Sequence, residues 1–342
     1  MINFESMEFS KSFIRLNWVA LVLIYLVVIA GSFVRITGSG MGCPDWPRCF
    51  GEWIPPTELE QLPENYQEIY LEKRTKKLNM FCQTLRSMGM KETAERLENN
   101  PEVLKEEDFN ARKTWTEYIN RLVGFLAGNT MLVAFVWMLL RYRKGRVIWI
   151  AAFNLVLMLF QAWFGSIVVA SNLVPWTITI HMFLALLIIG IQLYIIYLIS
   201  PRQNEELPQF NWVKYVLWFS LAVTFYQMFL GTQVREEIDL LVKQGYGQTQ
   251  WIEMMGMSFY IHRSFSWLVL VLLTIVAVKN ERSFKYWSVR WLYILLGIEL
   301  TSGVLLAYAE MPGLVRTAHL VFASVIFGIL VMMTFRMRSA NP

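Results

Sequence analysis

The chain contains three histidines, His181, His262 and His319, and each lies close to the start of a long apolar segment. A fourth segment, TEYINRLVGF, resembles the SFYIHRSFSW segment around His262 but has Asn120 in place of the histidine. Imidazole is the usual protein ligand of haem iron, and an ionisable residue within a membrane span indicates a functional site. The pattern therefore predicts a membrane haem protein with two related sites, one of which lacks a ligand.

Several arginines lie beside these positions or at the outer ends of spans: Arg35, Arg121, Arg235, Arg263 and Arg316. Buried guanidinium groups need anionic partners, and haem propionates would supply carboxylates in the bidentate geometry that arginine favours. Two alternatives stay open. Arg35 and Arg235 also fit snorkelling to the membrane interface, and Arg121 and Arg263 also fit structural ion pairs.

Glu117 lies three residues before Asn120, so the two side chains share a helical face. The matching position in the second half is Phe259, which makes the carboxylate specific to the site without its histidine. This placement favours a role in proton handling. A salt bridge to Arg121 or another arginine is the structural alternative.

Cys43 and Cys49 flank the sequence Pro-Asp-Trp-Pro-Arg in a predicted outer loop. Because the outer face is oxidising in many bacteria, a disulfide is expected, either structural or able to exchange electrons. Zinc is less favoured, since no paired Cys or His ligands lie nearby. Cys82 is left over as a free thiol.

The elements that must position these side chains are apolar helices. The chain of 342 residues is 56% hydrophobic and 15% aromatic, above the usual composition of soluble domains. About 20 apolar residues cross a bilayer, and eight such segments occur, which predicts an all-α integral membrane protein. They cover residues 15–36, 114–140, 147–170, 176–199, 212–232, 257–278, 287–308 and 314–335.

Short loops rich in Lys and Arg alternate with short loops that lack them. With eight spans the basic loops all fall on one side, and the positive-inside rule makes that side cytoplasmic, together with both termini. The net charge of +5 therefore reflects topology, and no nucleic-acid partner is expected. No cleavable signal or transit peptide is expected, since the first apolar run is too long and Glu5 and Glu8 precede it. A bacterial cytoplasmic membrane is the simplest location.

An internal repeat organises the chain, because the first four spans share landmarks with the last four in the same order. The landmarks are Gly-x-x-Val-Arg at 31–35 and 231–235, Tyr-Ile-Asn/His-Arg at 118–121 and 260–263, Gln/Glu-x-x-x-Gly at 161–165 and 299–303, and Thr-x-His at 179–181 and 317–319. We therefore expect two tandem four-helix bundles, residues 1–200 and 201–342, arranged as a parallel repeat. The long outer loop, 37–113, should carry one or two helices within 58–108, as a solvated cap or a partner surface.

The four landmark positions lie on spans that run inward, each about 9 Å below the outer end at the rise of an α-helix. Two imidazoles at one depth on facing helices can bind a haem iron from both sides. His262 and His319 thus form a complete pair, whereas His181 and Asn120 occupy the equivalent places in the first half.

These residues also carry a family resemblance. The stretch VRITGSGMGCPDWPRCFGEWIPP at 34–56, EYINR at 117–121, the YIHR step and the two Thr-x-His steps together resemble the heme A synthase family, over nearly the whole chain. The chain departs from the family pattern in two places. The usual step is Glu-x-x-His-Arg, where this chain has Asn120, and the second cysteine pair of some members is missing.

The resemblance implies an enzyme that oxidises the C8 methyl group of heme O to a formyl group by successive hydroxylations, for terminal oxidase assembly. It implies a heme b cofactor on His262 and His319 in the C-terminal half. It further implies heme O in the N-terminal half, with His181 at a ligand position and Glu117 as the catalytic glutamate. Heme O synthase and an electron donor are the implied partners, besides membrane lipid.

Two other function classes remain as alternatives. The first is a membrane b-type cytochrome or inactive homologue that carries electrons or binds haem, against which the asymmetric Glu117 argues. The second is a transporter, since duplicated four-span units occur there. A transporter needs no paired intramembrane histidines and more often has spans broken by Gly or Pro, which this sequence lacks.

Overall fold

The computed structural model describes residues 8–104, 108–143, 145–201, 211–279, 281, 287–309 and 312–338. Across these residues the regular structure is helical, apart from an isolated β-bridge between Cys49 and Glu52. Eight helices are long and apolar enough to cross a membrane, which confirms the predicted all-α class with eight spans. They are α1 (Lys11–Ile36), α4 (Ala111–Arg141), α5 (Gly145–Ala170), α6 (Pro175–Ile199), α7 (Asn211–Lys243), α9 (Met257–Lys279), α10 (Trp287–Tyr308) and α11 (Gly313–Arg338).

The segment between α1 and α4 contains the predicted additional helices, α2 (Tyr66–Ser87) and α3 (Lys91–Glu98), with short 3-10 turns at Leu59–Gln61 and Pro101–Leu104. Every third or fourth residue of α2 is buried, as in an amphipathic helix. The buried side chains pack with α3 and with Phe164, Ile167 and Val168 of α5. The two helices therefore cap the end of α5.

Helix α7 is longer than predicted, since the expected end was residue 232 and the helix continues to Lys243. No Pro or Gly interrupts the added turns before Gly245. Val234, Ile238 and Leu241 are buried along one face of this extension. The prediction failed because it followed only the strongly apolar part of the helix. A short helix that was not predicted, α8 (Gln248–Met254), follows.

The chain divides into two compact units. The first comprises Met1–Trp18, Tyr142–Ile150 and Ile189–Pro342, and the second comprises Val19–Arg141 and Ala151–Ile188. These bounds differ from the expected halves because the second part of α6 groups with the first unit, where Tyr194 contacts Phe335 with ring centroids 4.8 Å apart. The tandem organisation into 1–200 and 201–342 stays a prediction.

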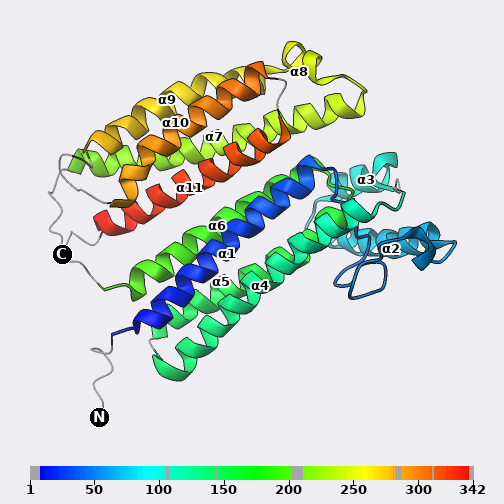
Figure 1. Cartoon of the computed structure of the whole chain (residues 1–342), viewed down its shortest axis with the longest axis horizontal. Coiled ribbons are helices and arrows are strands. Elements are labelled where there is room, and N and C mark those ends of the chain that lie inside the picture. The colour runs from blue at the N-terminus through cyan, green and yellow to red at the C-terminus, as the bar shows by residue number, and fades with distance from the viewer. Residues whose placement is uncertain are drawn as a thin grey trace. The chain divides into compact units, whose positions relative to one another are not determined.

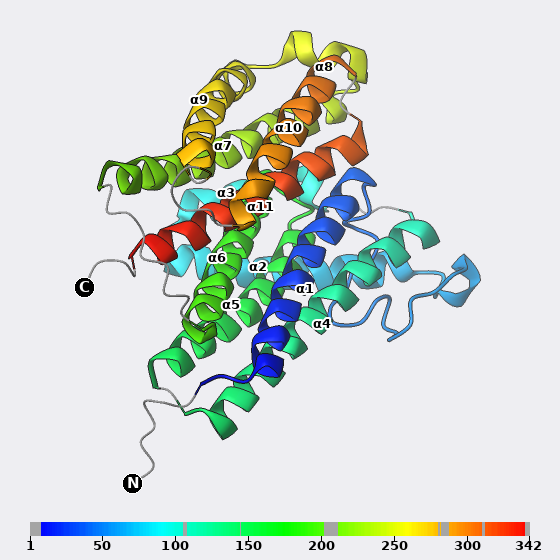
Figure 2. The ribbon, with the colours of Figure 1, turned by 60° about the vertical axis from the view of Figure 1, so that its left-hand side comes forward.

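In the first unit, α7, α9, α10 and α11 pack against one another and run side by side in both ribbon views (Figures 1 and 2). The centre of this bundle includes Leu217, Leu273, Val289, Leu292 and Leu330, all almost completely buried. Because lipid is as apolar as these side chains, close packing stabilises such contacts more than transfer from solvent does.

In the second unit, α4 and the parts of α1, α5 and α6 that belong to it run alongside one another in both views (Figures 1 and 2).

Four of the basic residues that support the topology prediction lie outside the described residues: Lys144, Arg202, Arg282 and Lys285.

Candidate functional site

The structure brings His262 of α9 and His319 of α11 together, with ring centroids 6.4 Å apart and ring planes inclined by 77°. Two imidazoles that bind one metal ion from opposite sides, at about 2 Å per bond, hold their centroids roughly 6–6.5 Å apart. The pair therefore fits the two axial ligands predicted for one haem iron.

Two side chains of α10 contact the Nδ1 atom of His319. Its Nδ1 atom lies 2.8 Å from Glu299 Oε2 and 2.8 Å from Ser302 Oγ. When Glu299 is ionised its carboxylate only accepts hydrogen bonds, so Nδ1 then carries the proton and Nε2 keeps the lone pair that can bind a metal. His262 is held differently, because Gln227 of α7 donates from Nε2 to the His262 carbonyl oxygen at 2.7 Å.

Glycines let the neighbouring helices approach these side chains. A Cβ atom added to Gly165 of α5 would lie 3.1 Å from His181 Cε1, and one added to Gly231 of α7 would lie 3.4 Å from His262 Cε1. A Cβ atom on Gly303 of α10 would lie 3.9 Å from His319 Cε1. An added methyl group would therefore be tight against His181, at the limit of ordinary contact with His262, and in ordinary contact with His319.

His181 of α6 lies within the second unit and stacks on Phe164, with ring centroids 6.3 Å apart and planes at 22°. Gln161 donates from Nε2 to the His181 carbonyl oxygen at 2.8 Å. The His181 Nδ1 atom is buried without a hydrogen-bond partner, and so is the Oδ1 atom of Asn120. No hydrogen bond therefore joins His181 and Asn120 through these two atoms.

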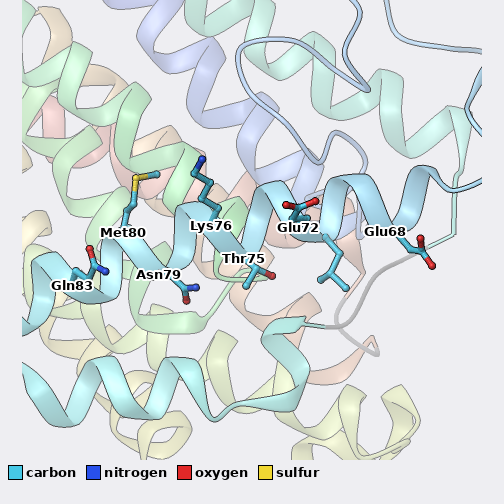
Figure 3. A pocket seen from close by; sticks show the side chains of 8 residues that line it. Glu68, Glu72, Thr75, Lys76, Asn79, Met80 and Gln83 are labelled. Atoms are coloured by element: carbon cyan, nitrogen blue, oxygen red, sulfur yellow. The ribbon is translucent and has the colours of Figure 1, made fainter.

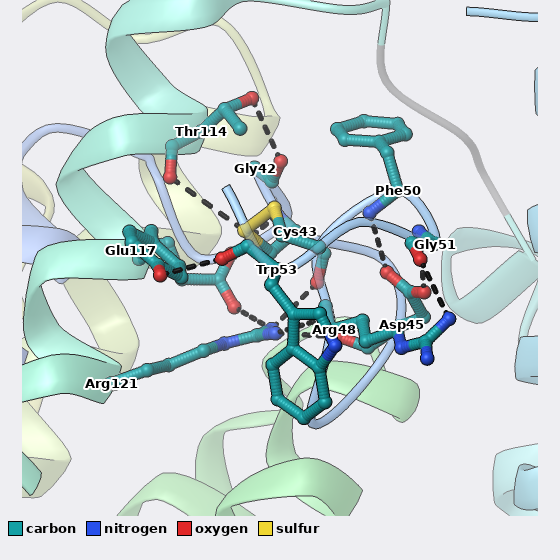
Figure 4. Close-up of a disulfide and its surroundings, with 12 residues drawn as sticks. Gly42, Cys43, Asp45, Arg48, Phe50, Gly51, Trp53, Thr114, Glu117 and Arg121 are labelled. Carbon is teal, nitrogen blue, oxygen red and sulfur yellow. Dashed lines mark hydrogen bonds and ion pairs between the residues drawn. A yellow bond between two sulfur atoms is a disulfide. The ribbon is translucent and has the colours of Figure 1, made fainter. Parts of the chain in front are cut away.

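Glu117 is buried, with 3% of its surface exposed, and both of its carboxylate oxygens have partners. The Cys43 backbone N–H donates to Oε2 at 2.8 Å, and the Arg121 guanidinium forms an ion pair with Oε1. Arg121 also donates to the Cys43 carbonyl at 2.7 Å and to the Arg48 carbonyl at 3.1 Å. Figure 4 shows this cluster beside the disulfide. Arg121 is thus the structural partner of Glu117, which was one of the two predicted alternatives.

Cys43 and Cys49 form the predicted disulfide, and Cys82 is free and buried. The loop that the disulfide closes is organised by Asp45, whose carboxylate accepts from the backbone N–H groups of Phe50 at 2.7 Å and Gly51 at 2.9 Å (Figure 4). Thr114 of α4 donates to the Gly42 carbonyl at 2.9 Å. The loop is therefore fixed against the first turns of α4, directly over Glu117.

The Phe50 ring extends this loop towards α2, where it meets Tyr70 edge to face with centroids 5.2 Å apart. Burial, together with the negative charges of Asp45 and Glu52, raises the pKa of Tyr70 to about 12. The phenol therefore stays protonated and neutral throughout the physiological range.

The remaining predicted arginines have varied surroundings. Arg235 pairs with Asp239 at 2.9 Å, one turn along α7, while its Nε and Nη1 atoms are buried without hydrogen-bond partners. Arg316 lies over the Trp251 ring at 5.9 Å. Arg263 is exposed, whereas Arg35 is half-buried. These two nitrogens of Arg235 could therefore donate hydrogen bonds to a further anionic partner.

A hollow runs along the exposed side of α2 (Figure 3). Its lining consists of Glu68, Leu71, Glu72, Thr75, Lys76, Asn79, Met80 and Gln83. None of the residues predicted from the sequence for haem binding or catalysis contributes to this lining.

Sequence reasoning missed the polar residues that hold the histidines. Gln161 and Glu299 were recognised as repeat landmarks only, and Gln227 was not singled out. The detectable signal is that Gln161, Gln227 and Glu299 each precede by four residues a glycine that contacts the same histidine.

Comparison with known proteins gives the family. A family model described as cytochrome oxidase assembly protein (COX15-CtaA) matches residues 14–98 and 90–331. The heme A synthase of Wolbachia pipientis wMel is 26% identical over 339 residues, which cover 90% of this chain and 87% of the relative. The heme A synthase of Wolbachia sp. subsp. Brugia malayi is 23% identical over 348 residues, which cover 93% and 95%. Since the family match spans most of the chain and includes both histidine sites, the chain belongs to the COX15-CtaA family of cytochrome oxidase assembly proteins.

Proposed function

We propose that the chain is a heme A synthase, which oxidises the C8 methyl group of heme O to a formyl group by successive hydroxylations. The observation that carries the proposal is the facing pair His262 and His319, with ring centroids 6.4 Å apart. Relatives named heme A synthase align over about the full length of the chain. The electron-carrier alternative is not favoured, because the relatives that align over most of the chain are named heme A synthases.

His262 and His319 would hold heme b as a cofactor, His319 through its Nε2 atom because Nδ1 contacts Glu299 and Ser302. A bound haem supplies the redox chemistry that side chains lack, while the protein binds and orients it. Arg235 and Arg316 would neutralise the propionates of this haem, since both lie in the same unit as the pair. Arg35 and Arg121 would neutralise the propionates of a haem bound at the His181 site. Arg263, which follows His262, is exposed, so it is the weakest candidate for a propionate partner.

His181 would hold heme O as the substrate on one face, without a second protein ligand. A neutral amide is a poor ligand for haem iron, so Asn120 would act by hydrogen bonding, for which its buried Oδ1 atom has no other partner. An open axial position is what oxygen chemistry at a haem requires.

Glu117 would handle protons during the oxidation. The Cys43 backbone N–H and Arg121 hold its carboxylate in a fixed orientation. The disulfide loop would contribute by keeping this carboxylate buried under the outer surface.

The proposal extends to the domain organisation, the membrane location and the partners of the enzyme. Residues 1–200 would form the substrate half and residues 201–342 the cofactor half, as a tandem duplication. The enzyme would lie in a bacterial cytoplasmic membrane with both termini on the cytoplasmic side. Heme O synthase would supply the substrate, and a separate donor would supply electrons.

The test is expression of the chain with a heme O synthase in a host that lacks heme A, followed by mass spectrometry of the extracted haems. Heme A or its hydroxylated precursor supports the proposal, whereas heme B and heme O alone contradict it. Glu117→Gln should abolish the product while heme b stays bound. Asn120→His should give a more six-coordinate, low-spin second haem and no gain in product. A large gain in heme A with Asn120→His would show that Asn120 impairs the enzyme.

A further inference from the structure

The two helices that face His181 and His319 differ at the residues that contact each histidine. On α5 the sequence is Gln161-Ala-Trp-Phe164-Gly165, and on α10 it is Glu299-Leu-Thr-Ser302-Gly303. The glycines are matched, and both contact the imidazole. The amide of Gln161 is replaced by the carboxylate of Glu299, and the phenyl ring of Phe164 is replaced by the hydroxyl of Ser302.

These differences decide what surrounds the Nδ1 atom of each histidine. His319 Nδ1 lies 2.8 Å from Glu299 Oε2 and 2.8 Å from Ser302 Oγ. His181 Nδ1 has no hydrogen-bond partner. The ring of His181 instead stacks on Phe164.

The Glu299 carboxylate lies against His319 through its Oε2 atom. Its side chain is 15% exposed, and its second oxygen, Oε1, is buried without a hydrogen-bond partner. His262, on the other side of the pair, also has an Nδ1 atom without a partner. Among the three histidines, only His319 therefore has its Nδ1 atom within hydrogen-bond distance of a carboxylate.

A carboxylate on the outer N–H of a metal-bound imidazole fixes the ring orientation and makes the imidazole a stronger electron donor. A stronger axial donor stabilises the oxidised iron more than the reduced iron, which lowers the reduction potential. We propose that Glu299 is a positioning residue that orients His319 and lowers the reduction potential of the haem held by His262 and His319. This inference rests on the proposed function, because it requires heme b at that pair.

The experiment is a spectroelectrochemical titration of heme b in the purified full-length holoprotein. Glu299→Gln keeps the side-chain shape and an acceptor oxygen but removes the charge, so the haem should stay bound and low-spin. Its midpoint potential should rise by an amount equivalent to a tenfold change in the oxidation equilibrium, about 59 mV for one electron. Ser302→Ala is the matched control, since it removes the other Nδ1 partner and keeps the carboxylate, and it should shift the potential less.

An unchanged potential in Glu299→Gln, or an equal shift in Ser302→Ala, would overturn the inference. If Glu299→Gln loses the haem, Glu299→Asp decides the question. If Glu299→Asp retains the haem with a near-native potential, the role of the charge is supported. If both variants lose the haem, the side chain acts through packing and the inference is overturned. A native protein without a bis-histidine heme b would refute the proposed function itself, whereas a native heme b insensitive to Glu299 refutes only this inference.

Discussion

The contact between Gly165 and His181 allows a graded test, because the same substitution can be made opposite His319. A Cβ atom on Gly165 would lie 3.1 Å from His181 Cε1, which is tighter than nine in ten real Cβ contacts, while one on Gly303 would lie 3.9 Å from His319 Cε1, an ordinary contact. Gly165→Ala should therefore displace the imidazole by a few tenths of an ångström, and Gly303→Ala should not.

The expected energies follow from two opposing effects. Replacing a helical glycine with alanine stabilises a helix by roughly 0.5–1 kcal/mol, whereas overpacking a closely packed site costs about 1–3 kcal/mol. Gly303→Ala should be neutral or slightly stabilising. Gly165→Ala should lose up to about 2 kcal/mol, because Phe164 stacks on the His181 ring and limits its movement.

Activity should respond more strongly than stability. Misplacing a reacting group by about 1 Å can cost a hundredfold in rate, so a shift of a few tenths of an ångström should lower heme A yield several-fold in Gly165→Ala. The heme b spectrum should persist in both variants and reports that the protein is folded. Equal loss of product in the two variants, or full activity in Gly165→Ala, would refute the argument from the glycine contact.

Three further predictions concern the haem ligands, the free thiol and the membrane topology. His262→Ala and His319→Ala should each remove or convert the low-spin heme b spectrum, and a spectrum that survives both would exclude the pair as ligands. Burial raises the pKa of the Cys82 thiol, so it should resist alkylation in native protein at about pH 7–8 and react only after unfolding or at higher pH; rapid native labelling would contradict this. Arg143→Cys and Ala309→Cys should be labelled from opposite sides of the membrane, and labelling from one side would exclude the eight-span topology.

Much of the fold was predictable because membrane spans have a simple signal. Apolar length located all eight helices, since unpaired backbone groups are excluded from lipid and a spanning segment must be helical. The extension of α7 to Lys243 was missed, because it is stabilised by burial of every third or fourth residue, which a hydropathy average does not detect. The paired histidines were predicted to meet, and they do.

The outer loop was less predictable. The disulfide was expected from the two cysteines, but its position over Glu117 depends on backbone groups of the loop. Backbone donors and acceptors are present in every residue, so no residue pattern marks those that meet a given side chain. The ion pair of Glu117 with Arg121 was predictable, as an i,i+4 pair on one helix.

A polar residue accompanies each histidine, and none accompanies Asn120 at the matching place. On three helices Gln161, Gln227 and Glu299 each precede by four residues a glycine that contacts a histidine, and each hydrogen-bonds to that histidine. On α1 the glycine that lies against Asn120 is preceded at the same spacing by Val27, which has no polar group. The place that lacks an imidazole thus also lacks the polar residue that holds one. Two matched differences at a single site argue that this place is not built for a ligand, and that Asn120 is one part of an altered site.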